Sequence, residues 1–146
     1  MELSHAHKGG DPMEMIIGGA FQGKTEYARR NHPQIVFADG GSMDPEQAFT
    51  VQGINHFEGL IRRLLLAGED PFSFAERLIR ENPDIVIISR EIGYGVVPVD
   101  RFERDCREAV GRICTRLAAE SDKVTRVICG IGSVIKERGK LCPFSF

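Results

Sequence analysis

A short stretch near the amino terminus, GGAFQGKT, constrains the fold more than any other part of this sequence. It fits the pattern G-x-x-x-x-G-K-[ST], with Lys24 and Thr25 as its last two residues. The apolar run MEMIIGG leads into it and a segment with helical periodicity follows, so it lies between a predicted strand and a predicted helix. In that position backbone N–H groups converge on phosphate oxygens at the positive end of a helix. The stretch therefore predicts a phosphate-binding loop; the alternative is a glycine-rich turn.

Each part of this loop has a separate chemical role. Lys24 is expected to reach the β- and γ-phosphates as a compact charge, and the Thr25 hydroxyl is expected to coordinate Mg²⁺. The predicted substrate is a purine nucleoside triphosphate, ATP or GTP, with Mg²⁺ as cofactor. The predicted nucleotide-binding residues are Gly18, Gly19, Ala20, Phe21, Gln22, Gly23, Lys24 and Thr25.

Phosphoryl transfer on such a loop commonly needs a carboxylate that helps to hold Mg²⁺. Asp39 directly follows the apolar run IVFA, so it is expected at the carboxyl end of a neighbouring strand, on the ligand side of the sheet. Asp84 opens its strand and should point to the opposite edge, and Glu91 is the reserve candidate. We assign the metal to Thr25 and Asp39, although Asp39 could equally be a turn former in Asp-Gly-Gly.

The remaining pattern predicts an α/β fold, a P-loop NTPase-like open and mainly parallel sheet with helices on both faces. Short apolar runs alternate with helical segments, and the run DIVIIS is typical of a central parallel strand. The longest helix is predicted over residues 45–67, and further helices begin after Asp70 and Asp100. Residues 1–12 are expected to form a flexible tail, and residues 13–146 a single domain.

The loop SREIGYGVVP follows the central strand, so it is expected on the ligand side of the sheet. Gly93 and Gly95 would let its backbone approach a bound molecule. The segment could equally be an ordinary connection between a strand and a helix.

Charge and hydropathy exclude several classes of partner. The formal net charge is −2, with acidic and basic residues nearly balanced, so the chain has no basic field for a nucleic acid backbone. No apolar run is long enough to span a bilayer, and the amino terminus lacks a secretory pattern. We expect a cytoplasmic protein that acts on a small molecule, with neither nucleic acid nor membrane as partner.

Three segments, GGAFQGKT, REIGYGVVP and GRICTRLAAESDKVTRVICGIG, together resemble the bifunctional adenosylcobinamide kinase/adenosylcobinamide-phosphate guanylyltransferase family. The resemblance implies a P-loop fold and a role in cobalamin assembly. Such an enzyme phosphorylates the aminopropanol hydroxyl of adenosylcobinamide and then attaches GMP from GTP through a guanylylated histidine. It also implies a homo-oligomer, a cobinamide-type acceptor and a ligand loop shaped by Glu91, Gly93 and Gly95.

Two departures from the family pattern bear on activity. The stretch between Asp39 and Asp84 is shorter than in the family, which indicates that one strand with its helix is absent. His56, expected on the helix over residues 45–67, is the only histidine that this region offers for guanylylation, and it is displaced from the position where the family motif is expected. We therefore expect a transferase with Lys24, Asp39 and His56 as catalytic residues. The alternatives are a nucleotide-binding regulatory or remnant module without acceptor chemistry, and a kinase for an unrelated small metabolite.

Overall fold

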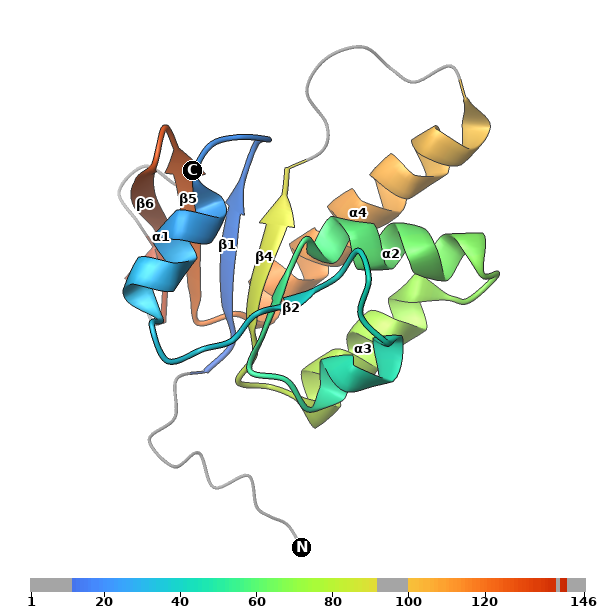
Figure 1. Cartoon of the computed structure of the whole chain (residues 1–146), viewed down its shortest axis with the longest axis horizontal. Helices are drawn as coiled ribbons and strands as arrows, with labels where there is room; N and C mark the ends of the chain where they lie inside the picture. The colour runs from blue at the N-terminus through green and yellow to red at the C-terminus, as the bar shows by residue number, and fades with distance from the viewer. Residues whose placement is uncertain (1–11, 92–99, 139, 142–146) are drawn as a thin grey trace, which may run out of the picture.

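The computed structural model describes residues 12–91, 100–138 and 140–141, and in this part the strands form one sheet (Figure 1). The strand order is β2-β3-β4-β1-β5-β6-β7. The central strand β1 (Glu14–Gly18) pairs in parallel with β4 (Val86–Arg90) on one side and with β5 (Lys123–Ile128) on the other. The predicted α/β fold with an open, mainly parallel sheet is confirmed.

The two edges of the sheet differ in direction. On one side β3 (Gly53–Asn55) is parallel to β4, and β2 (Ala38–Asp39) is parallel to β3, so these strands and β1 end at the same edge. On the other side β6 (Ile131–Glu137) and β7 (Lys140–Leu141) are antiparallel. The parallel half therefore brings the loops after β1, β3 and β4 together.

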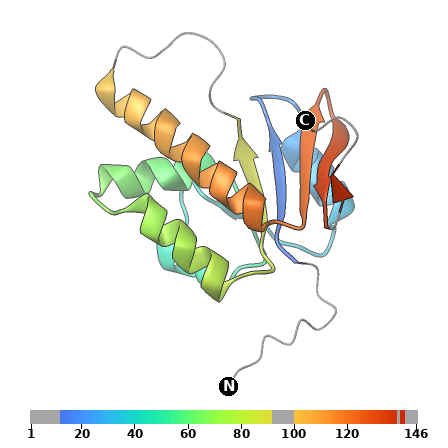
Figure 2. The same ribbon diagram turned by 180° about the vertical axis from the view of Figure 1, so that it is seen from behind.

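Helices cover both faces of the sheet, as expected. The short helix α1 (Lys24–Asn31) packs on one face, whereas α2 (Phe57–Leu66), α3 (Pro71–Glu81) and α4 (Arg101–Glu120) form a layer on the other (Figures 1 and 2). Alternate residues of each strand point to opposite faces, so β1 contributes Met15 to the core under the larger layer and Ile16 to the core under α1.

The starts of α3 and α4 follow the predicted signals. The Asp70 carboxylate accepts a hydrogen bond from the Phe72 backbone N–H at 2.9 Å, and Asp100 accepts one from Phe102 at 2.8 Å. These bonds satisfy N–H groups that have no partner within the helix. Both aspartates therefore fix where their helices begin.

The single helix predicted over residues 45–67 is wrong. The segment contains a 3-10 helix, η1 (Pro45–Phe49), then β3, then α2. Apolar residues in all three happen to recur at helical spacing, and a strand of three residues is too short to show alternation. Gly53 makes this strand possible, because a Cβ there would lie 2.5 Å from two ring carbons of Phe37.

Some predictions fall on parts of the chain that the structure does not describe. Residues 1–11 of the predicted tail lie outside the described residues, as do Gly93 and Gly95 of the ligand loop. Within the described part, no helix combines the length and the apolar character that crossing a bilayer requires.

Candidate active site

The predicted phosphate-binding loop connects the end of β1 to the start of α1. Gly18 ends β1 beside β5, where a Cβ would lie 2.5 Å from the carbonyl oxygen of Val127. Gly23 has φ 87° and precedes the first helical residue, so it supplies a left-handed conformation that other residues rarely adopt. A close backbone contact at Gly18 and a left-handed conformation at Gly23 therefore explain why these two motif positions carry glycine.

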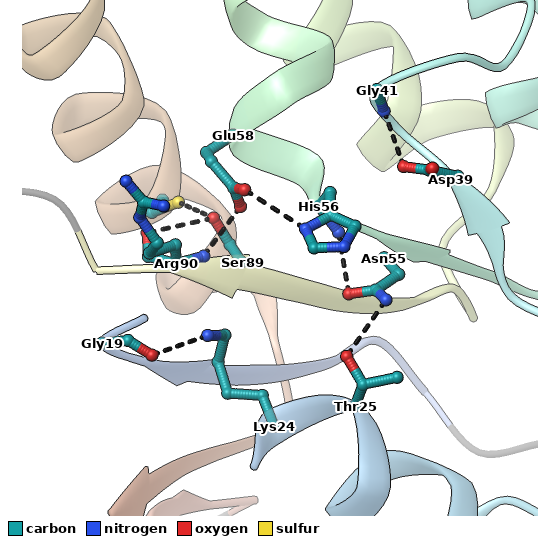
Figure 3. Close-up of polar contacts among 11 residues, drawn as sticks. Gly19, Lys24, Thr25, Asp39, Gly41, Asn55, His56, Glu58, Ser89 and Arg90 are labelled. Atoms are coloured by element: carbon teal, nitrogen blue, oxygen red, sulfur yellow. Dashed lines mark hydrogen bonds and ion pairs between the residues drawn. The ribbon is translucent and has the colours of Figure 1, made fainter. Parts of the chain in front are cut away.

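The Lys24 side chain folds back over the loop. Its ammonium group donates a hydrogen bond to the carbonyl oxygen of Gly19 at 2.8 Å (Figure 3). Burial lowers the pKa of Lys24, and the neighbouring Arg90 charge lowers it further, whereas the carboxylates of Glu58 and Glu91 oppose the shift. An anion bound in front of the loop would stabilise the charged form of this ammonium group and so raise the pKa of Lys24 again.

Thr25 is joined to the end of β3 by a short chain of hydrogen bonds. The amide Nδ2 of Asn55 donates to the Thr25 hydroxyl oxygen at 3.1 Å, and the backbone N–H of His56 donates to Oδ1 of Asn55 at 2.9 Å. Figure 3 shows the Asn55 side chain reaching from its strand toward Thr25. β3 therefore supports the loop even though β4 lies between it and β1.

A cavity of about 400 Å³ opens in front of the loop. Residues 20–26 line it from one side, and His56, Glu58 and Arg90 line it from the other. The volume lies within the range of small-molecule sites. Phe21 at its border is fully exposed and has φ 59°, an unusual conformation for a bulky residue.

Glu58 organises the side of the cavity that faces the loop. One of its carboxylate oxygens accepts a hydrogen bond from the backbone N–H of Arg90 at 2.8 Å, and the other lies 3.6 Å from Nδ1 of His56 (Figure 3). The Glu58 side chain is 15% exposed and that of His56 is 58% exposed. The carboxylate is thus held in place, while the imidazole is open to the cavity.

The structure brings some of the predicted residues together and separates others. The loop residues 20–25 and His56 share the cavity, but His56 precedes α2 with φ 55° and does not lie within a helix as predicted. Asp39 is not among the lining residues. It ends β2, beyond β3 and β4, and its carboxylate accepts a hydrogen bond from Gly41 N–H at 2.9 Å.

Glu91 is not among the cavity-lining residues, and it contacts the start of the phosphate-binding loop through its own backbone N–H. Its N–H donates to the carbonyl oxygen of Gly18 at 2.8 Å, and its carboxylate forms an ion pair with Arg126 at 3.2 Å. Across the described residues no cluster of three histidine, cysteine or acidic side chains is arranged to hold a metal ion.

Sequence reasoning missed three residues of this site: Asn55, Glu58 and Arg90. All three lie at or just after the carboxyl ends of β3 and β4, where ligand-binding residues of parallel sheets gather. Asn55 and Glu58 both fall within the single helix predicted over residues 45–67, so the end of β3 was not recognised. Recognising the strand at residues 53–55 from Gly53 and Ile54 would have located them.

Comparison with known proteins supports the family resemblance. Residues 69–135, from the start of α3 into β6, match the family model "Cobinamide kinase / cobinamide phosphate guanyltransferase". The chain is also 34% identical to the bifunctional adenosylcobalamin biosynthesis protein CobU of Salmonella typhimurium over 102 residues, which are 70% of this chain and 51% of that protein. It is 40% identical over 52 residues to the protein of the same name from Escherichia coli, covering 36% of this chain and 29% of that protein. The chain thus matches about half the length of the first of these relatives and less of the second.

Proposed function

We propose that this chain, a relative of the cobinamide kinase / cobinamide phosphate guanyltransferase family, binds a purine nucleoside triphosphate and transfers its γ-phosphoryl group to a cobinamide-type acceptor. The observation that carries the proposal is the cavity in which the loop residues face His56, Glu58 and Arg90. Here the loop amides and Lys24 on one side face Arg90 on the other, across a space large enough for a small molecule.

In this proposal the loop binds phosphate oxygens mainly through backbone N–H groups at the start of α1. The Lys24 ammonium exchanges its hydrogen bond with Gly19 for the β- and γ-phosphate oxygens. Arg90, whose charge already acts on Lys24, adds positive charge on the opposite side of the cavity. Such fixed donors stabilise charge that develops on the transferred group without having to reorganise.

The reaction then requires little covalent chemistry from the protein. The acceptor hydroxyl oxygen attacks the γ-phosphorus, the bond to the β–γ bridging oxygen breaks, and the nucleoside diphosphate leaves with that electron pair. The hydroxyl proton passes to a base, for which the held carboxylate of Glu58 is the candidate in the cavity. Any Mg²⁺ that enters with the nucleotide would be held mainly by phosphate oxygens, because the Thr25 hydroxyl accepts a hydrogen bond from Asn55 and the described residues offer no cluster of three metal-binding side chains.

His56 favours guanylyl transfer as a second activity of the same cavity. Glu58 lies on the Nδ1 side of the imidazole at 3.6 Å, which leaves Nε2 as the nucleophile. Nε2 would attack the α-phosphorus of GTP, and pyrophosphate would leave with the electron pair of the bond that breaks. A phosphate oxygen of the phosphorylated acceptor would then attack the same phosphorus, the P–N bond would break with its electron pair returning to the histidine, and the GMP group would pass to the acceptor. This step rests on the position of His56 in the cavity.

A transfer assay tests both activities. Labelled phosphate should pass from γ-labelled ATP or GTP to adenosylcobinamide, and the Lys24→Ala variant should lose this transfer while it stays folded. Acid-labile labelling of the protein by α-labelled GTP should disappear in His56→Ala and persist in a control such as Arg112→Ala, a residue on α4 away from the cavity-lining set. Nucleotide binding without either transfer would favour the alternative, a regulatory or remnant module.

A further inference from the structure

The side chain that contacts the Thr25 hydroxyl is an amide and not a carboxylate. Asn55 reaches the loop from the end of β3, and its Nδ2 lies 3.1 Å from the hydroxyl oxygen of Thr25 (Figure 3). In P-loop NTPases this threonine or serine shares Mg²⁺ with an aspartate from a neighbouring strand. The structure therefore presents a neutral group where such enzymes present a charged one.

The orientation of this amide follows from its other partner. The backbone N–H of His56 donates to Oδ1 of Asn55 at 2.9 Å. A backbone N–H can only donate, so the oxygen of the amide must face His56 and the NH₂ group must face Thr25. The atom of Asn55 nearest the expected metal position is consequently a hydrogen-bond donor, which cannot coordinate a cation.

Of the acidic residues near Thr25, Glu26 follows it on α1, where it is ion-paired with Arg29 at 3.7 Å, and neither Asp39 nor Glu58 replaces the missing carboxylate. Asp39 lies one strand farther along the sheet, and its Oδ1 accepts from Gly41 N–H. Glu58 is in the cavity, but one of its oxygens is engaged by the backbone N–H of Arg90 and the other faces His56. The donor set beside Thr25 therefore does not fit a tightly held Mg²⁺.

We propose that Asn55 sets the metal dependence of this site, so that nucleotide is bound through the loop and Lys24 with little contribution from Mg²⁺. This inference rests on the proposed nucleotide binding. A carboxylate at residue 55 fits the same space, because one oxygen can accept from His56 N–H and the other can accept from the Thr25 hydroxyl. Asn55→Asp should consequently create the charged metal position that the wild-type chain lacks.

The test compares dissociation constants of ATP and GTP measured by equilibrium dialysis with excess Mg²⁺ and with EDTA. For the wild-type chain the two constants should be similar. For Asn55→Asp their ratio should rise by about 10- to 100-fold, the effect typical of a group that supports a metal ligand. Asn55→Ser removes the amide without adding charge, so its ratio should stay at the wild-type value. Circular dichroism and thermal melting confirm that each variant is folded.

The outcomes separate this inference from the proposed function. Nucleotide binding with the same Mg²⁺ ratio in Asn55→Asp and wild type would overturn the role of Asn55 alone. A wild-type chain that already loses most of its affinity in EDTA would also overturn it. Failure of the wild-type chain to bind either nucleotide under both conditions would overturn the proposed function and this inference together.

Discussion

Replacing Gly18 by alanine tests the packing that shapes the phosphate-binding loop. An alanine Cβ at this position would lie 2.5 Å from the carbonyl oxygen of Val127, and real Cβ atoms essentially never approach another atom to less than 3.0 Å. The obstacle is backbone of the neighbouring strand β5, so either β5 or the loop must move. Forced overpacking of this kind costs about 1–3 kcal/mol.

The adjacent residue provides a matched control. A Cβ at Gly19 would find its nearest neighbour, Cγ of Gln22, at 3.7 Å, an ordinary contact. For a domain of this size each kcal/mol shifts the melting temperature by about 2–4 °C, so Gly18→Ala should melt several degrees below Gly19→Ala. Thermal unfolding followed by circular dichroism measures the difference. Equal melting temperatures of the two variants would refute the steric reasoning.

Three further predictions concern other parts of the structure. Burial lowers the pKa of Lys24, and bound phosphate would raise it again, so nucleotide affinity should fall as the pH rises through the lowered pKa of Lys24 in the free protein. Equilibrium dialysis between pH 7 and 10 measures this fall, and the Lys24→Met variant should not show it. Burial raises the pKa of Cys114 to about 11, so iodoacetamide at pH 8 should modify the exposed Cys129 and spare Cys114 in the folded protein. Peptide mass spectrometry measures the modification of each cysteine, and equal modification of the two would contradict the burial of Cys114. Asn82→Ala removes two 2.8 Å hydrogen bonds to carbonyls at and just after η1 and should reduce the free energy of unfolding by about 1–3 kcal/mol in urea titrations, whereas an unchanged midpoint would show that water replaces them.

The sequence predicted those parts of the fold that have strong local signals. The loop motif, the aspartates before α3 and α4, and the apolar run of β4 each specify their element within a few residues. β3 had no such signal, because three residues cannot show alternation and the residues around them repeat at helical spacing. Its pairing depends on Gly53 accommodating the Phe37 ring, which is a contact between separate segments.

The same missing strand explains which site residues were misplaced. With residues 45–67 predicted as one helix, Asp39 became the first acidic candidate at the expected edge of the sheet, ahead of Glu91, and Asn55 was placed inside the helix. In the structure β3 and β4 lie between Asp39 and the loop strand, and Asn55 contacts Thr25. The loop itself needed no such information, because all its residues are contiguous in the sequence.

Equilibrium dialysis with labelled ATP and GTP tests the central claim most directly, namely that the loop after β1 binds the phosphates of a nucleotide. The wild-type chain should take up one nucleotide per chain, and Lys24→Ala should weaken this binding by about 10-fold or more, since a hydrogen bond to a charged group contributes about 1.5–3 kcal/mol. Absence of uptake by the folded wild-type chain, or equal uptake by Lys24→Ala, would contradict the account.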